Sequence, residues 1–138
     1  DNPTALSAAE LQPFIDDGSI EYLGATDDVR PFIEDADCVV LPSYREGAPR
    51  SLIEAAAMGR PLVATDVAGC SAVVDHGETG LLCAARSSDA LADAMEKMLD
   101  LGPEARQAMG SAGRTKMVAQ YSVDYVIEAY RQAIAELT

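Results

Sequence analysis

Short apolar runs alternate with longer amphipathic segments along this chain. The runs at residues 38–41, 62–64 and 81–83 are aliphatic and bounded by turn residues, and a further run lies at 20–23. Runs of this length and composition are typical of buried parallel strands, and the helical segments between them are typical of βαβ crossovers. The pattern therefore predicts an α/β fold, a Rossmann-like, doubly wound parallel sheet with helices on both faces.

Capping residues and prolines mark the expected helix boundaries. Ser7 and Glu10 have the spacing of a capping box, and Pro49 suits the first position of a helix. Gly18 and Gly59 suit helix C-termini. Helices are expected at residues 7–16, from Thr26 or Asp27 to about 36, at 49–58, 88–101 and 103–120, and from 122 to near the C-terminus, with a short helical turn around 72–74.

The chain is strongly acidic, with a formal net charge of −13. The stretch 45–60 is the exception, because three arginines there outnumber two glutamates. Without a basic stripe the chain cannot release counterions from a phosphate backbone, which excludes a nucleic-acid partner. A small anionic ligand would be tolerated at the central stretch. For Arg60 the simpler interpretation is a cation at a helix C-terminus.

Composition is consistent with one domain and a cytosolic protein. The chain has 138 residues, 49% of them hydrophobic and only 5% aromatic, so its core is expected to be aliphatic. Of the three cysteines, Cys38 and Cys83 fall in apolar runs, whereas Cys70 lies in a glycine-containing loop and is expected to be accessible. The odd number suits a reducing compartment. No apolar run reaches the ~18 residues of a membrane span, which favours a cytoplasmic location, with peripheral attachment at the inner face of the membrane left open for a longer protein.

The segment from Tyr44 to Gly59 carries the candidate chemistry. It follows the run at 38–41, so it is expected at the carboxyl ends of the strands, where open α/β sheets bind ligands. A helix beginning near Pro49 would direct the N–H groups of Arg50, Ser51 and Leu52 outward, which forms an anion site suited to phosphate. Gly47 would allow close approach of the backbone to a ligand, or a positive φ.

Two glutamates flank this helix start. Glu54 lies just over one turn into the helix, where its carboxylate can accept hydrogen bonds from vicinal hydroxyls, and Glu46 lies in the preceding loop. Carboxylates on both sides of a phosphate site make sense for a ligand with hydroxyls on both sides of its phosphates, such as a nucleotide sugar. The pattern also allows a solvated helix residue at Glu54 and an exposed loop carboxylate at Glu46.

The segments 41–49 and 54–65 resemble the donor-binding motif of retaining GT-B glycosyltransferases of the large family 4 type (glycosyltransferases group 1). The residues in question read LPSYREGAP and EAAAMGRPLVAT, and similarity extends from about residue 20 to 138. The resemblance implies the C-terminal, donor-binding half of a GT-B fold. It also implies a glycosyltransferase of hexosyltransferase type that uses a UDP- or GDP-linked sugar with retention of configuration, without a metal or other cofactor.

The resemblance also implies roles for particular residues. Glu46 matches the first glutamate of the E-x7-E motif, which contacts the donor sugar at the catalytic centre, and Glu54 matches the second, which binds ribose. Further donor contacts are implied for Gly47, Ala48, Pro49, Arg50 and Ser51. The loop Leu23, Gly24, Ala25 and Thr26 would lie against the nucleobase, and Gly69 and Cys70 would form the wall of the sugar pocket.

Two departures from the family pattern concern the phosphate and sugar contacts. The chain has Glu46-Gly47-Ala48-Pro49 where many members have E-G-F-G, so the proline removes one N–H donor. It also has Gly69-Cys70 where a Gly-Gly pair is common.

The resemblance covers only part of a GT-B enzyme. The N-terminal domain that would bind the acceptor, a glycan or lipid-linked sugar, is absent, so the isolated chain is expected to be inactive. In the family's 3-2-1-4-5-6 order the strand at 20–23 is third and the strand at 38–41 is fourth, so they are not neighbours. Either the two re-pair directly, or exposed strand edges lead the chain to self-associate. The wording of the motif resembles that of enzymes of surface-polysaccharide and glycoconjugate synthesis.

Two other functional classes remain compatible with the pattern. One is a non-catalytic, Rossmann-like nucleotide-binding module, although no G-x-G-x-x-G follows any expected strand. The other is a flavodoxin-like interaction domain, which the acidic surface and the long C-terminal helices would suit. His76 is the sole histidine and lies in a turn, so a structural or solvent-exposed role is expected for it.

Overall fold

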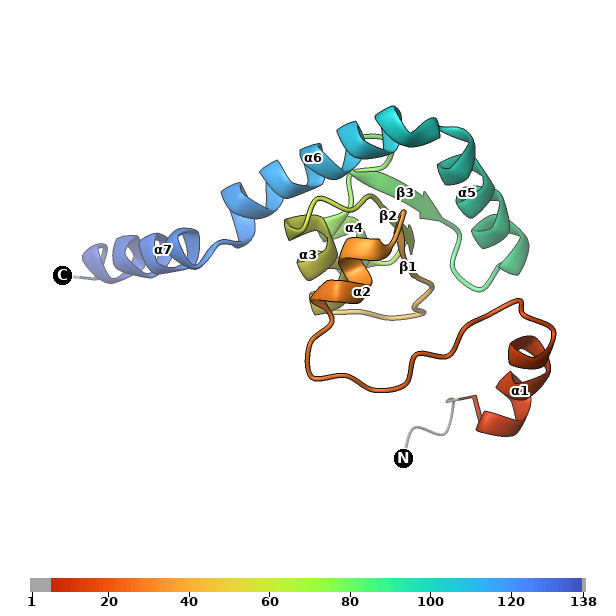
Figure 1. Ribbon diagram of the computed structural model, residues 1–138. Coiled ribbons are helices and arrows are strands. Elements are labelled where there is room, and N and C mark those ends of the chain that lie inside the picture. The colour runs from red at the N-terminus through yellow and green to blue at the C-terminus, as the bar shows by residue number, and fades with distance from the viewer. Residues whose placement is uncertain (1–5, 138) are drawn as a thin grey trace.

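A computed structural model describes residues 6–137 and has a three-stranded parallel sheet at its centre (Figure 1). The strands are β1 (Val39–Leu41), β2 (Leu62–Thr65) and β3 (Gly80–Cys83), and they lie in this order across the sheet. Val63 of β2 pairs with Val40 on one side and with Leu81 on the other. The α/β class and the parallel sheet predicted from the pattern are therefore confirmed.

Successive side chains of each strand point to opposite faces of the sheet. Both faces carry apolar side chains, and helices cover each of them. Leu62 and Ala64 face a core shared with α2, α3, α4 and the second half of α6, whereas Val63 faces a core shared with α5 and the first half of α6. The helices are α1 (Ala8–Asp16), α2 (Arg30–Asp35), α3 (Arg50–Ala57), α4 (Ala68–Val73), α5 (Ser88–Asp100), α6 (Gly102–Tyr121) and α7 (Val123–Ala135).

Most helix boundaries follow the capping signals of the sequence. Ser7 and Glu10 form the predicted capping box at the start of α1, and Ser122 accepts a hydrogen bond from the Tyr125 N–H at the start of α7. Pro49 is the N-cap of α3, so the helix begins at Arg50, one position after the predicted start. Gly59 follows α3 with a φ of +75°, a conformation that glycine adopts without strain.

The predicted strand at residues 20–23 is wrong. This segment has no regular secondary structure and pairs with no strand of the described chain. Its side chains are exposed, with Tyr22 at 68% and Leu23 at 56%. A strand exists only through pairing with a neighbour, and this segment runs outside the sheet on its way from α1 to α2 (Figure 1).

Two predicted helix starts also differ from the structure. The helix expected from Thr26 or Asp27 begins at Arg30, because Thr26 and Asp28 use their side chains to stabilise a turn that precedes it. The helical turn expected around 72–74 is α4, which already begins at Ala68. The loop expected at 66–70 is therefore helical in its second half.

Helix α6 crosses α3 at a contact between two glycines. A Cβ at Gly110 would overlap the backbone carbonyl of Gly59, so only glycine permits this approach. Further along α6, the Arg114 guanidinium donates to the Ala57 carbonyl at 2.6 Å, and Lys116 pairs with Asp75 at 2.8 Å. These contacts hold α6 against the end of α3 and the segment after α4.

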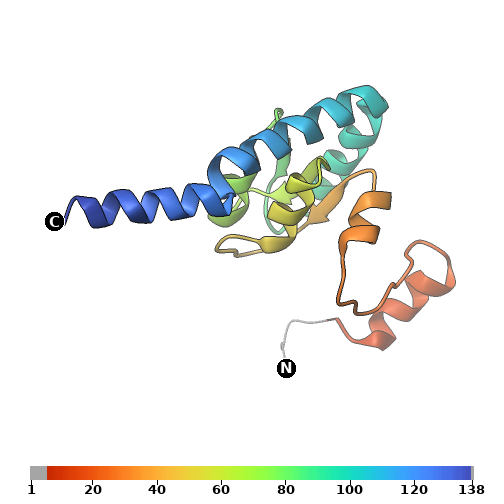
Figure 2. The same cartoon turned by 60° about the vertical axis from the view of Figure 1, so that its left-hand side comes forward.

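The two terminal helices contribute no buried residue to the core. Helix α7 extends beyond the body of the molecule in both views, and α1 lies at the far end of an extended segment (Figures 1 and 2). Along α7, Tyr130 is 69% exposed and Ile134 60% exposed. None of the helices in residues 6–137 combines the length and the apolar composition that a membrane span requires.

Candidate functional site

The loop between β1 and α3 is held at the carboxyl end of the sheet by side-chain hydrogen bonds. The Ser43 hydroxyl donates to Oε1 of Glu46 at 2.5 Å. The Thr65 hydroxyl, at the end of β2, donates in turn to the Ser43 carbonyl. Glu46 is consequently a half-buried carboxylate with a fixed position and is not a freely solvated loop residue.

Helix α4 packs directly against this loop. A Cβ at Gly69 would overlap the backbone carbonyls of Glu46 and Gly47, so the two segments touch through their main chains. Gly47 has no positive φ, and a Cβ added to it would meet open space. A backbone conformation that requires glycine is therefore excluded as the reason for this residue, and close approach to a ligand stays a prediction.

Cys70 is fully buried, and the expectation that it is accessible is wrong. It lies inside α4 and faces the core, because the segment that the sequence indicated as loop is helical. Burial raises the pKa of the Cys70 thiol, and the nearby Glu46 carboxylate raises it further. The thiol is therefore protonated and unreactive at neutral pH, and its contribution at this site is packing.

The start of α3 presents unpaired backbone donors. The N–H groups of Arg50 and Ser51 make no backbone hydrogen bond to any residue in the range 6–137. The Leu52 N–H, also expected to be free, donates to the Pro49 carbonyl at 3.1 Å, so it is not available to a ligand. The anion-binding capacity of this helix start therefore rests on Arg50 and Ser51, together with the helix dipole.

Glu54 opens into a cavity of about 450 Å³ between α3 and the turn before α2. Its side chain is 41% exposed and pairs with the Arg50 guanidinium at 3.2 Å, one helical turn earlier. Such an exposed pair contributes little stability and leaves carboxylate oxygen lone pairs for a ligand. The cavity is lined by Asp27, Asp28, Val29, Arg30, Ile33, Glu54, Ala57 and Met58.

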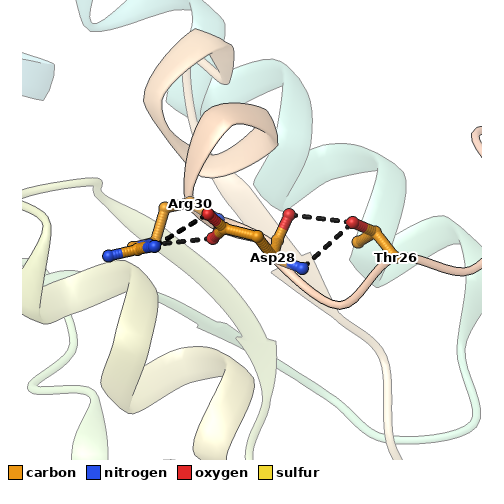
Figure 3. A network of polar contacts seen from close by, with 3 residues as sticks. All are labelled: Thr26, Asp28 and Arg30. Carbon is orange, nitrogen blue, oxygen red and sulfur yellow. Dashed lines mark hydrogen bonds and ion pairs between the residues drawn. The ribbon is translucent and has the colours of Figure 1, made fainter.

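A turn held by polar contacts between Thr26, Asp28 and Arg30 precedes α2 (Figure 3), and Asp28 and Arg30 line this cavity. The Thr26 hydroxyl donates to the Asp28 carbonyl at 3.0 Å and accepts from the Asp28 N–H at 3.1 Å. Both oxygens of the Asp28 carboxylate accept from the Arg30 guanidinium, each at 2.8 Å. This bidentate pair, with the Arg30 N–H, lowers the pKa of Asp28 to about 2.

This turn should loosen only at strongly acidic pH. Because the pKa of Asp28 is lowered from 3.8 to about 2 in the folded chain, its contribution to stability is fully present above pH 3.8 and is lost as the pH falls through about 2. We expect an NMR titration of the Asp28 carboxyl carbon to have its midpoint near 2. Arg30→Gln should move the midpoint up toward 3.8, and a midpoint at 3.8 in the unmodified chain would contradict the structure.

The structure brings together only some of the residues predicted for the site. Glu46, Gly47 and Gly69 are in one cluster, and Glu54 lies one turn into the adjoining helix. Glu46 is not among the residues that line the Glu54 cavity. The loop 23–26 is exposed, and it is the next four residues, 27–30, that line the cavity.

Two features of this region were not predicted from the sequence. The Asp28–Arg30 pair could have been found, because an aspartate two residues before an arginine at a helix start is a recognisable turn signal. The second feature is Arg86, whose φ is +62° and whose guanidinium lies 5.5 Å from the centre of the Tyr44 ring. With Tyr44 it lines a second cavity, of about 350 Å³, at the same edge of the sheet. No turn signal in the sequence indicates this conformation.

No group of three or more His, Cys, Asp or Glu side chains in residues 6–137 could hold a metal ion. The exposed His76 accepts a hydrogen bond from the Leu82 N–H at 2.9 Å, so it stabilises the turn before β3. Its structural role, as expected, is confirmed.

The parallel sheet and its crossover helices define a Rossmann-like α/β domain. Residues 2–101 match the family model of glycosyl transferases group 1, and the chain belongs to this family.

Two curated relatives show the extent of the similarity. The chain is 34% identical over 94 residues to N,N'-diacetylbacillosaminyl-diphospho-undecaprenol alpha-1,3-N-acetylgalactosaminyltransferase of Campylobacter jejuni. The aligned region is 68% of this chain and 25% of that protein. It is 31% identical over 136 residues to D-inositol 3-phosphate glycosyltransferase of Paenarthrobacter aurescens. The aligned region is 92% of this chain and 33% of that protein. The chain thus spans a quarter to a third of the length of these relatives.

Solved structures agree on the fold. Sucrose-phosphate synthase from Thermosynechococcus elongatus superposes with a TM-score of 0.80 at 28% identity, over 93% of this chain and 33% of that chain. HepE from Anabaena, determined in complex with UDP and in another structure with UDP-glucose, superposes in the UDP complex with a TM-score of 0.82 at 19% identity, over 93% of this chain and 35% of that chain. The expected fold, the C-terminal part of a GT-B glycosyltransferase, is confirmed.

Proposed function

We propose that this chain is the donor-binding part of a glycosyltransferase that uses a nucleoside-diphosphate sugar. In the whole protein we expect hexosyl transfer with retention of configuration, to a glycan or lipid-linked acceptor bound by the rest of the molecule. Membership of the glycosyl transferases group 1 family and the UDP-glucose complex of the structural neighbour HepE support this proposal.

The observation that carries the proposal is the position of Glu54. Its half-buried carboxylate lies beside a cavity of about 450 Å³, on the helix whose first N–H groups are unpaired. A nucleotide placed across this helix start would set its ribose hydroxyls against Glu54 and its diphosphate against the Arg50 and Ser51 amides. The nucleobase would then enter the cavity, between Met58 and the segment from Leu23 to Arg30.

The sugar would lie on the other side of the diphosphate, at the Glu46 loop. Ser43 and Thr65 fix this loop, so the Glu46 carboxylate is already oriented before a ligand arrives. We assign the sugar contact at the catalytic centre to Glu46 and further donor contacts to Gly47, Ala48 and Pro49. Gly69 and Cys70 would support the sugar pocket from behind.

Other parts of the assignment concern the whole protein. We expect no metal ion, because stabilisation of the leaving diphosphate can come from backbone N–H groups, the dipole of α3 and basic side chains. We place the protein in the cytoplasm or at the inner face of the membrane, in polysaccharide or glycoconjugate synthesis. We also expect the isolated chain to be inactive and to self-associate.

Calorimetric titration with UDP tests the role of Glu54. Loss of two charge-assisted hydrogen bonds predicts that Glu54→Ala binds UDP about 10- to 100-fold more weakly. The matched control is Glu128→Ala, which removes an exposed helical glutamate with an arginine partner on α7 and should leave the affinity unchanged.

A second ligand identifies the hydroxyl contact. The unmodified chain should bind 2′-deoxy-UDP more weakly than UDP, whereas Glu54→Ala should bind the two equally. Unchanged UDP affinity in Glu54→Ala would refute the ribose role, and a persistent preference for UDP would assign the ribose contact to another residue.

A further inference from the structure

A third cavity, of about 280 Å³, lies at the amino edge of the sheet, opposite the Glu46 loop. Three segments meet there: Asp37 (two residues before the start of β1), the turn between α3 and β2, and the first turns of α6. None of the residues that line this cavity is assigned to the nucleotide site proposed above. The cavity is lined by Asp37, Gly59, Arg60, Pro61, Pro103, Arg106 and Gln107.

Arg60 brings an unpaired guanidinium to this cavity. Its Nε is buried and has no hydrogen-bond partner in the structure, and its guanidinium forms no ion pair with any residue in the range 6–137. The main chain of Arg60 is fixed, since its N–H donates to the Ala55 carbonyl at 3.0 Å. The terminal nitrogens of Arg60 are not buried and donate to no residue in the same range, so they are the donors that a ligand in the cavity could reach.

A second arginine is held rigidly in the same cavity. The Arg106 side chain is only 16% exposed, and it donates to the Leu99 carbonyl at 2.9 Å and to Asp37 at 3.2 Å. A guanidinium carries five N–H donors in a planar fork, so further donors of Arg106 are available. Asp37 is 74% exposed and offsets one of the two positive charges. The cavity therefore keeps a net positive charge in a chain whose total charge is −13.

We propose that this cavity is a binding site for a phosphate group, held between Arg60 and Arg106. The planar fork of a guanidinium matches two oxygens of a tetrahedral oxyanion, and such charge-assisted pairs are shorter and stronger than hydrogen bonds between neutral groups. Arg60 is also a cation at the end of α3, where its N–H caps the helix, but that role leaves the donors of its guanidinium without an acceptor.

NMR of the arginine side chains tests the site on the unmodified chain. Inorganic phosphate, added at constant ionic strength, should shift the Arg60 Nε–H resonance in a saturable manner. Ribose 5-phosphate, titrated in parallel, shows whether the site prefers the free ion or a phosphate monoester, and preferential binding of either supports the proposal. A resonance that does not move, or that moves linearly with both ligands, would overturn it.

Two variants distinguish specific phosphate binding in this cavity from nonspecific attraction of phosphate to positive charge on the surface. Arg60→Gln should weaken phosphate binding at least 10-fold and leave UDP affinity unchanged. The matched control Arg131→Gln, which removes an arginine that is 74% exposed on α7, should change neither affinity. Equal phosphate affinity in Arg60→Gln and the unmodified chain, or an equal loss in Arg131→Gln, would overturn the proposal.

Discussion

Gly69→Ala is expected to displace the Glu46–Gly47 loop and to destabilise the fold by about 2–3 kcal/mol, the upper part of the range typical of overpacking. The added Cβ would overlap two backbone carbonyls, which cannot rotate away as a side chain would. Because the loop is held by Ser43 and Thr65 at the end of the sheet, its movement should also carry Glu46 away from its present position.

Urea unfolding of the variant measures the first effect, and UDP-glucose titration measures the second. The matched control is Gly47→Ala on the other side of the same contact, where a Cβ would meet open space and the backbone has no positive φ. That variant should unfold at the midpoint of the unmodified chain. Equal stability of the Gly69 variant and the Gly47 variant would show that the two segments are not in main-chain contact.

Gly110→Ala is expected to be the most damaging small substitution in α6. Its Cβ would overlap the Gly59 carbonyl at the crossing of α6 with the end of α3, so the helix would have to move outward. We expect a loss of about 3 kcal/mol in the free energy of unfolding, because overpacking against main chain cannot be relieved by a change of rotamer.

Gly113→Ala in the same helix has the opposite expected sign. Its Cβ would lie 3.6 Å from the Ala56 Cβ and 3.7 Å from the Thr79 Cβ, which is ordinary van der Waals contact. Replacing a helical glycine with alanine should then stabilise the fold by about 0.5–1 kcal/mol. Thermal unfolding of the two variants compares them directly, and a common direction of change would contradict the packing of α6 described here.

The local signals of the sequence were sufficient for most of the fold. Cap residues at Ser7 and Ser122 and the stop at Gly59 predict helix ends because they act on adjacent backbone groups. The strands β1, β2 and β3 were predictable because aliphatic runs of that length must be buried.

What the sequence could not predict depends on partners that are distant along the chain. The run at 20–23 has the composition of a strand, but a strand forms only where another strand pairs with it. No strand of the described residues pairs with this run. Cys70 follows a glycine and was expected in a loop, but that glycine serves the close approach of α4 to the Glu46 loop. Composition alone cannot distinguish these two uses of glycine.

The candidate site was predictable in its residues and less so in its geometry. Spacing placed Glu46 before α3 and Glu54 within it, as found. The bond from Thr65 to Ser43, which holds the Glu46 loop, joins residues 22 positions apart, and a local motif does not encode such a tertiary contact. The same holds for the cavity beside Glu54, since its far wall comes from a separate segment.

The strand order has a consequence for the speed of folding. Because β1, β2 and β3 follow one another in the sheet as they do in the chain, each pairing closes a single short crossover and costs little loop-closure entropy. Such an order favours faster folding than a parallel sheet whose neighbouring strands are farther apart in the chain. The Gly59–Gly110 crossing joins parts much farther apart in the chain, so α6 is expected to dock last, onto a sheet that is already formed.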